Sequence, residues 1–267
     1  MSGKDTGTDA GDKVAGTAAF TKFMRILQLV ADAPLPMTLT ELCKASGFPR
    51  GTAYRTVYAL MTEGLLAESA LTGKIALGPR LLSLASQSWR QSDLRRLAEP
   101  FLAELRDRTG ETVHLAVFDG TDMVFVDKLE SPRAVQMSSR IGTKVALHSS
   151  SVGKAYLAFQ PSGRRGELLA GIPEPWPALT PKTLRDKAAL RRQLEQIRER
   201  GWAVDDEEQE DGIRCFGAPV FDRQGSVAAC VSVTTLRYRE AADPLLAYVE
   251  PLRNACQGIG DKLRGTP

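Results

Sequence analysis

The chain has 267 residues, of which 43% are hydrophobic and 25% are charged. That length suits one large domain or two ordinary ones, and the apolar content is enough for a core in each. The longest apolar run, around residues 227–233, is far too short to span a bilayer, and the glycine-rich N-terminus has no signal-peptide pattern. These properties exclude a membrane-spanning protein and predict a globular protein of the cytoplasm.

The excess positive charge lies in the N-terminal third. The net charge is only +3, yet residues 1–90 carry ten Lys and Arg against seven Asp and Glu, whereas residues 91–267 carry twenty-five of each. Such a distribution is expected when one end of a protein meets a polyanion and the other end does not.

The cysteines and histidines form no recognisable metal or disulfide pattern. The cysteines are Cys43, Cys215, Cys230 and Cys256. Without a C-x-x-C pair among them, reduced thiols are the plain expectation. His114 and His148 are the only histidines, and they lack metal-ligand spacing with Cys215. We expect neither a metal nor another cofactor.

Three helices are predicted after a flexible tail over residues 1–17. The first has apolar residues at helical spacing, at Phe20, Phe23, Leu27 and Val30. Thr38 and Glu41 form a capping box that opens the second helix. Pro49 suits the first position of a third helix, which runs to about Glu63.

A hairpin follows these helices over residues 65–78, with a turn at Thr72 and Gly73. Helix, helix-turn-helix and hairpin in this order predict a winged helix-turn-helix over residues 18–78. In this fold, the N-terminal end of the recognition helix enters the DNA major groove.

Gly51 is the residue that favours a DNA-binding role for the third helix. A glycine within a helix costs roughly 1 kcal/mol relative to alanine, so its presence suggests that something comes close to that turn. We predict DNA contacts for Thr38, Arg50, Gly51, Thr52, Tyr54, Arg55 and Lys74. Arg55 is the strongest candidate for a base contact. In the alternative interpretation, Arg50 and Arg55 are only the solvated face of a structural helix.

The rest of the chain mixes helices with hairpins. Residues 79–93 are predicted as a linker helix, and Pro100 kinks or splits the helical pattern that follows it. Strands are expected over residues 112–118, 123–129, 135–141, 202–204, 213–221 and 227–234, and helices over residues 151–159, 186–200 and 240–263. This order predicts an α+β protein whose antiparallel sheet is flanked by helices.

Several motifs together resemble the IclR family of bacterial transcription regulators. They are "GFPRGTAYRTVYAL", "LGPRLLSLA", "LHSSSVGKAYLAF" and the long stretch that begins "LTPKTLRDKAAL" and ends "VAACVSVTT". The resemblance covers nearly the whole chain from about residue 18. It implies a winged helix-turn-helix, a linker helix and a GAF-like effector-binding and oligomerisation domain over residues 94–267. It also implies a homodimer or homotetramer.

The same resemblance implies a pocket for a small carboxylate effector. The positions that match the family's pocket are Ser151, Val152, Asp205, Cys215, Ser232 and Thr234. The amides of Ser151 and Val152 would hold the carboxylate at a helix N-terminus. Lys154 either adds positive charge nearby or is an ordinary exposed lysine. Cys215 and Ser232 could instead be small core residues.

The acidic run over residues 205–211 could be a solvated loop instead of part of the pocket. The sequence also departs from the family pattern. Lys22-Phe23-Met24 replaces a usual Arg-Ala-Leu, Ala146 replaces a common proline, and Thr234 replaces a serine.

The leading hypothesis is a regulator that binds a pseudo-palindromic operator and senses a small organic acid. It is not expected to be an enzyme. Two alternatives remain open. One is an enzyme that uses Cys215 on a small acid. The other is a DNA-binding protein whose second domain has no ligand and serves assembly alone.

Overall fold

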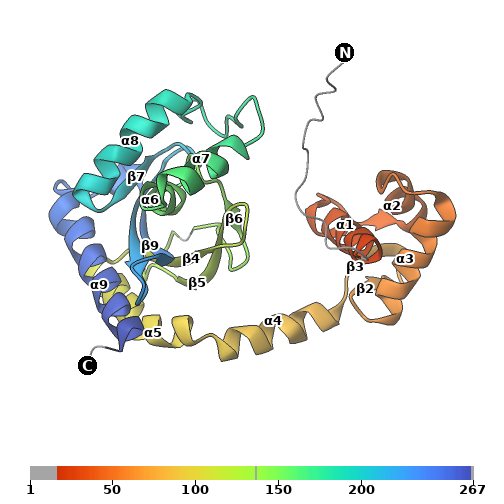
Figure 1. Ribbon diagram of the computed structural model, residues 1–267. Helices are drawn as coiled ribbons and strands as arrows, with labels where there is room; N and C mark the ends of the chain where they lie inside the picture. The colour runs from red at the N-terminus through yellow and green to blue at the C-terminus, as the bar shows by residue number, and fades with distance from the viewer. Residues whose placement is uncertain (1–16, 136, 266–267) are drawn as a thin grey trace, which may run out of the picture. The chain divides into compact units, whose positions relative to one another are not determined.

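The computed structural model describes residues 17–135 and 137–265, and the tail predicted for residues 1–17 lies almost entirely outside them. The chain divides into two compact units, and the boundary falls between Gln91 and Ser92 (Figure 1). The first contains helices and a small sheet. The second contains a larger antiparallel sheet with helices on both faces. The α+β prediction is confirmed.

The N-terminal unit is built from α1 (Ala18–Asp32), β1 (Met37–Thr38), α2 (Leu39–Ala45), α3 (Arg50–Thr62), β2 (Leu66–Glu68), β3 (Lys74–Leu77) and α4 (Pro79–Gln91). Its three strands are antiparallel in the order β1-β3-β2. β1 was not predicted, because two residues are too few for a periodic pattern.

Local signals in the sequence account for α2 and α3. The Thr38 hydroxyl accepts from the Glu41 N–H at 3.3 Å, and the Glu41 carboxylate accepts from the Thr38 N–H at 2.8 Å, so the predicted capping box is present. On α3, Ala53 and Val57 are fully buried, whereas Arg55 is exposed. The helix therefore has a buried inner face and an exposed outer face.

The C-terminal unit contains a six-stranded sheet in the order β6-β5-β4-β9-β8-β7. Its strands are β4 (Thr112–Phe118), β5 (Met123–Leu129), β6 (Lys144–Val145), β7 (Ala203–Asp206), β8 (Ile213–Phe221) and β9 (Val227–Leu236). Its α-helices are α5 (Asp93–Thr109), α6 (Ser151–Ala158), α7 (Ser162–Ala170), α8 (Lys187–Arg200) and α9 (Glu250–Arg264). Helices α5 and α9 cover one face, and α6, α7 and α8 cover the other (Figure 1).

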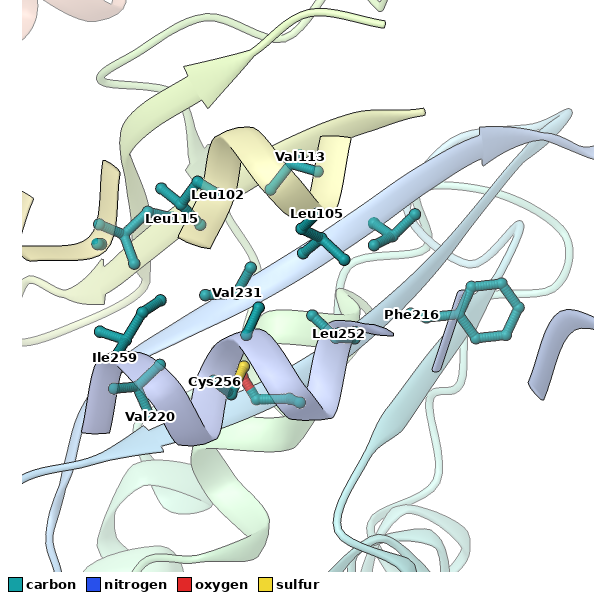
Figure 2. Packing of buried hydrophobic residues seen from close by; sticks show 14 of the residues in the cluster. Leu102, Leu105, Val113, Leu115, Phe216, Val220, Val231, Leu252, Cys256 and Ile259 are labelled. Atoms are coloured by element: carbon teal, nitrogen blue, oxygen red, sulfur yellow. The ribbon is translucent and has the colours of Figure 1, made fainter. Parts of the chain in front are cut away.

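Alternation along the strands divides the sheet into an apolar and a more polar face. Val113, Leu115 and Val231 pack against α5 and α9, together with Leu252 of α9 (Figure 2). The residues between them in sequence point to the other face. On β9 these are Cys230, Ser232 and Thr234, and on β4 they include His114. The more polar face is the one that α6 covers.

The strand predicted over residues 135–141 is wrong. Residues 135 and 137–141 have no strand structure and form an irregular segment with bends at positions 135 and 138, and Gln136 lies outside the described residues. The Nζ of Lys128 donates to the carbonyls of Met137 at 2.8 Å and Ser139 at 2.6 Å. Because a lysine occupies these carbonyls, the segment forms a loop held over β5.

Two helix predictions also need correction, and one helix was missed. Pro100 does not split the helical pattern, because α5 is one helix whose buried face packs on the sheet. The helix predicted over residues 240–263 begins late, after a 3₁₀ turn (Arg237–Arg239) and a π-helical segment (Leu245–Val249). α7 was not predicted. None of the helices in the described ranges combines the length and apolar character needed to cross a membrane.

Candidate functional site

Strand register brings three of the predicted pocket residues into one row. Asp205 on β7 is the register partner of Cys215 on β8, and Cys215 is the partner of Thr234 on β9. Ser232 lies two residues before Thr234 and pairs with His114 on β4. Residues in register on neighbouring strands point to the same face. The row therefore presents a carboxylate, a thiol and a hydroxyl together.

The first turn of α6 lies over this row. Ser150 is the N-cap of α6, and its hydroxyl accepts from the Gly153 N–H at 3.0 Å and donates to the Ala146 carbonyl at 2.7 Å. This cap satisfies only the third N–H of the helix. The N–H groups of Ser151 and Val152 have no acceptor within α6. The helix start therefore offers two donors and the positive end of the macrodipole.

The row and the helix start line a partly open cavity of about 220 Å³. All six predicted pocket positions line it: Ser151, Val152, Asp205, Cys215, Ser232 and Thr234. The wall also contains residues that were not predicted as pocket residues, among them Phe125, Met137, Ser139, Lys144, Gln209 and Glu210. Met137 and Ser139 belong to the loop that was mistaken for a strand. Nothing in the sequence alone placed that loop over the sheet.

Asp205 is the most strongly perturbed acid of the cavity. Its side chain is 2% exposed. One carboxylate oxygen accepts from the N–H groups of Glu208 at 2.8 Å and Gln209 at 3.2 Å. Burial raises the pKa of Asp205 to about 7, although Lys154 and these two N–H donors oppose the rise. Asp205 is thus poised to hold or release a proton near neutral pH.

His114 is a buried, neutral hydrogen-bonding group. Its Nε2 is 2.8 Å from the Ser139 hydroxyl, and its Nδ1 is 3.4 Å from the Thr234 hydroxyl. The ring stacks on Phe125 with centroids 4.2 Å apart. Burial, followed by the nearby Lys128, lowers the pKa of His114 to about 3. The imidazole connects the loop of residues 137–141, called the lid loop below, to the row of strand residues at the floor of the cavity.

Cys215 is not an activated thiol. Burial raises its pKa far above the ordinary value, and the carboxylate of Asp205 raises it further. The Thr234 hydroxyl is within 3.4 Å of the sulfur. Among the described residues, no group of three or more His, Cys, Asp or Glu side chains is arranged to hold a metal ion.

Lys154 is a fully buried residue, so the exposed-lysine interpretation is wrong. Its Nζ pairs with the carboxylate of Glu208 and lies 3.4 Å from Oε1 of Gln193. The solvated-loop interpretation of the acidic run also needs correction, because Asp205 and Glu208 are buried. A buried ammonium usually needs a carboxylate partner, yet the sequence did not show which residue of the run supplies it.

The predicted DNA-binding residues lie on the outer surface of the N-terminal unit. Arg50, Gly51 and Arg55 are exposed, and Thr52 and Tyr54 are half-buried. A β-carbon on Gly51 would meet no other atom within 4 Å. Internal packing therefore does not require this glycine.

Thr38 and Lys74 are brought together by the register of β1 and β3. The Thr38 hydroxyl donates to the Glu41 carboxylate at 2.8 Å, so it already serves the cap of α2. The Arg50 guanidinium lies over the ring of Tyr54 at 5.4 Å, and the Arg55 Nε donates to the Gly51 carbonyl at 3.2 Å. Both arginines therefore belong to the surface at the start of α3.

Each of the two units matches a known protein family. Residues 19–70 match the IclR helix-turn-helix domain. Residues 86–260 match the family described as bacterial transcriptional regulator IclR C-terminal. The chain belongs to the IclR family. Its helix-turn-helix is a DNA-binding domain, and the protein is a transcription regulator.

Relatives of this IclR-family chain align over most of their length. BhcR of Paracoccus denitrificans is 35% identical over 97% of this chain and 93% of its own. The Thermotoga maritima IclR structure is 33% identical, with a TM-score of 0.68 over 92% of this chain and 98% of that one. An IclR homologue from Microbacterium hydrocarbonoxydans, solved in complex with 4-hydroxybenzoate, is 28% identical with a TM-score of 0.76, covering 93% of this chain and 100% of that one.

Proposed function

We propose that this regulator binds a small carboxylate in the cavity beneath α6, and that the bound acid changes its affinity for a pseudo-palindromic operator. The observation that carries the proposal is that the start of α6 and the row of polar strand residues line the same cavity. The start of α6 provides anion-binding N–H groups, and the row of Asp205, Cys215 and Thr234 provides polar partners.

The carboxylate would bind at the start of α6. Ser151 and Val152 are both buried, so their N–H groups act where water competes little. An anion at such a helix start gains hydrogen bonds and a favourable interaction with the macrodipole. The 4-hydroxybenzoate complex of the Microbacterium homologue supports an acid as the kind of ligand.

The opposite wall would recognise the rest of the ligand. Asp205 is a strong acceptor, and the hydroxyls of Ser232 and Thr234 both donate and accept. Thr234 carries a methyl group that the serine usual in the family lacks, which narrows this end. The wall therefore suits hydroxyl or keto groups beside a carboxylate.

Operator binding would use the exposed start of α3 and the wing. Arg55 would contact base edges, and Arg50 and Lys74 would contact phosphates. Gly51 would let the DNA backbone or a base edge approach the helix closely. Because these contacts require the chromosome, we place the protein in the cytoplasm.

A homo-oligomer suits the apolar surface of α4. Leu82 is 76% exposed and Leu84 is 52% exposed in a single chain. A second copy of the chain packed along α4 would cover these side chains and remove their apolar surface from water. A dimer would present two recognition helices on successive major-groove turns, so its operator would be pseudo-palindromic.

Sensing is favoured over catalysis by the state of Cys215. A cysteine nucleophile needs a lowered pKa or an adjacent base, whereas burial raises the pKa of this thiol. His114 lies in the same cavity, but its ring nitrogens face Ser139 and Thr234. The cavity itself disfavours a ligand-free assembly domain.

Operator binding by the full-length protein tests the proposal. Fluorescence anisotropy on its own promoter, with and without a panel of hydroxy, keto and aromatic acids, should show selective binding that at least one acid changes. Arg55→Ala should cost about 1 to 3 kcal/mol and relax base preference. Lys74→Ala should mainly reduce the slope of log affinity against log salt, by about one.

Arg96→Ala is the matched control, because it removes an exposed arginine from α5 in the other unit. It should leave affinity and salt slope unchanged. An Arg55→Ala protein that is as tight and selective as the parent would remove Arg55 from the interface. A parent that prefers no stretch of its promoter, with or without acids, would refute the function itself.

A further inference from the structure

We infer that the cavity selects acids with a single carboxylate and a hydroxyl at the opposite end, and rejects dicarboxylates of the same size. The inference rests on the proposed effector site and concerns which acid that site accepts. It comes from the charged groups around the cavity and from the size of the cavity.

The positive side chains around the cavity are already paired. Lys144 is the only described cationic residue in the wall, and its Nζ is 2.7 Å from the Asp119 carboxylate. The buried Lys154 pairs with Glu208. Within the described part of the chain, the cavity therefore offers a carboxylate the helix start but no unpaired ammonium or guanidinium group.

Lys128, which lies under the lid loop, is occupied in the same way. Its side chain is 7% exposed, and its Nζ binds two lid carbonyls and the Glu130 carboxylate, the latter at 2.7 Å. If the Lys128 side chain turned toward a ligand, it would lose the hydrogen bonds that hold the lid loop. A ligand with two carboxylates would therefore have the start of α6 for one of them and no positively charged partner for the other.

The row beneath the helix start contains an acid. Asp205 lines the cavity and is 2% exposed, and the exposed Glu210 also lines it. A second ligand carboxylate beside Asp205 would place like charges together at a poorly solvated position, where their repulsion is weakly screened. A monocarboxylate avoids this cost because its charge stays at the start of α6.

The same wall accepts hydrogen bonds. One oxygen of Asp205 receives the two backbone donors of its own turn, and the carboxylate has further acceptor capacity toward the cavity. A ligand hydroxyl can donate to Asp205, and the Thr234 and Ser232 hydroxyls can donate to the ligand. A ligand carboxylate can only accept. Hydroxy acids are therefore complementary to this wall, whereas dicarboxylates are not.

The volume of the cavity limits the size of the acid that it can hold. An enclosed apolar space of about 150 Å³ is known to take up benzene, and this cavity measures about 220 Å³. It can thus hold acids from two carbons up to one substituted ring. The stacked rings of His114 and Phe125 would provide a flat wall for the larger ones.

Isothermal titration of the full-length protein at pH 8 tests the inference with three pairs of probes. Each pair exchanges a hydroxyl for a carboxylate: glycolate and oxalate, 3-hydroxypropanoate and malonate, 4-hydroxybenzoate and terephthalate. We expect at least one hydroxy acid to bind saturably, and its dicarboxylate partner to bind at least tenfold more weakly.

Two variants distinguish local charge from general charge. Asp205→Asn should reduce the discrimination to less than threefold. Asp206→Asn removes the same charge one residue later, where the carboxylate faces Arg214 at 3.4 Å outside the cavity. It should leave the discrimination at the parent's value.

The titration distinguishes a failure of the inferred selectivity from a failure of the carboxylate site. If a dicarboxylate binds as tightly as its hydroxy partner, or if Asp205→Asn keeps full discrimination, the inferred selectivity is overturned and the carboxylate site still stands. If none of the six probes binds, the carboxylate site itself is overturned, and this inference falls with it.

Discussion

Gly217 on β8 supports the first residue of α6 so closely that a β-carbon on it would lie 2.7 Å from the Ser151 carbonyl carbon. Gly153 makes a similar approach, because its β-carbon would lie 2.6 Å from the Ala146 carbonyl oxygen. Real β-carbons are not found at such distances. The position of the helix start over the sheet therefore depends on two absent side chains.

Gly217→Ala should damage the cavity. The added methyl group meets backbone atoms, so α6 must shift, at a cost of about 1 to 3 kcal/mol in unfolding free energy. Binding of whichever acid the parent binds should weaken at least tenfold, because the Ser151 and Val152 N–H groups move. Urea unfolding and titration calorimetry measure the two effects.

Gly163→Ala is the control for this substitution. Gly163 lies in the first turn of α7, where a β-carbon would meet nothing within 4 Å. Alanine there should be neutral or stabilise by up to about 1 kcal/mol. If Gly217→Ala behaves like Gly163→Ala in both measurements, the close approach does not set the pocket.

Gly51→Ala should separate stability from DNA binding. Because a β-carbon at Gly51 has open space and the residue lies in the first turn of α3, alanine should stabilise the N-terminal unit by about 1 kcal/mol or less. Operator affinity should nevertheless fall at least tenfold, since the methyl group occupies the space proposed for DNA. Thermal unfolding and anisotropy on the operator report each effect.

Unchanged operator affinity in Gly51→Ala would contradict a close approach of DNA to this residue. A Gly51→Ala protein that is more stable and binds the operator as tightly as the parent would place the DNA at another part of α3. Gly163→Ala again serves as the control, because it makes the same chemical change in a helix away from the operator-binding unit.

The sequence predicted most of the elements because their signals are local. The capping box at Thr38, the inner face of α3 and the alternation of β4, β8 and β9 depend on neighbours within a few residues. The six pocket positions came from the family resemblance. The common face of the four positions that lie on strands follows from strand parity, since Cys215 alternates with Phe216 and Ser232 with Val231.

What the sequence missed depends on distant contacts. The lid loop resembled a strand because apolar residues alternate in it, yet Lys128 takes its carbonyls. Lys154 resembled a surface residue because its partner, Glu208, lies fifty-four positions later. Neither interaction produces a periodic pattern in the sequence from which it could be predicted.

The Lys154–Glu208 pair should behave as a unit. Lys154→Met leaves the buried Glu208 carboxylate without its ammonium, and Glu208→Gln leaves the buried ammonium without its carboxylate. Removing one partner of a buried ion pair costs about 3 to 5 kcal/mol, whereas replacing both is far less costly. The double variant should therefore be more stable than either single variant.

A double-mutant cycle from urea unfolding checks this coupling. The control is the exposed pair Arg164 and Glu167 on α7, whose coupling should be below about 1 kcal/mol. Additive effects of Lys154→Met and Glu208→Gln would contradict the proposed dependence of each residue on the other.

Asp205 should give stability an unusual dependence on pH. Burial raises the pKa of this carboxyl from 3.8 to about 7. Between about pH 4 and pH 7 the folded chain holds a proton that the unfolded chain has released, so stability falls as pH rises through this window. One pKa unit corresponds to about 1.4 kcal/mol, so the loss is at most about 4 kcal/mol above pH 8.

His114 acts in the opposite direction over much of the same range. Because its pKa is lowered from 6.5 to about 3, the unfolded ring takes up a proton that the folded ring refuses as pH falls below about 6.5. Its contribution to stability is therefore lost on acidification, which masks the slope from Asp205 in the parent protein.

A difference measurement isolates Asp205 from His114 and from the charged groups that face it, which are Lys154, Glu208 and Glu210. Unfolding free energies of the parent and Asp205→Asn, compared from pH 4 to pH 8, should diverge in favour of the variant as pH rises, because asparagine carries no charge to bury. Asp206→Asn, whose carboxylate is half-exposed on the other face of β7, should track the parent. Parallel curves for the parent and Asp205→Asn would mean that Asp205 is ionised in the folded protein well below pH 7, and that its charge is balanced by Lys154.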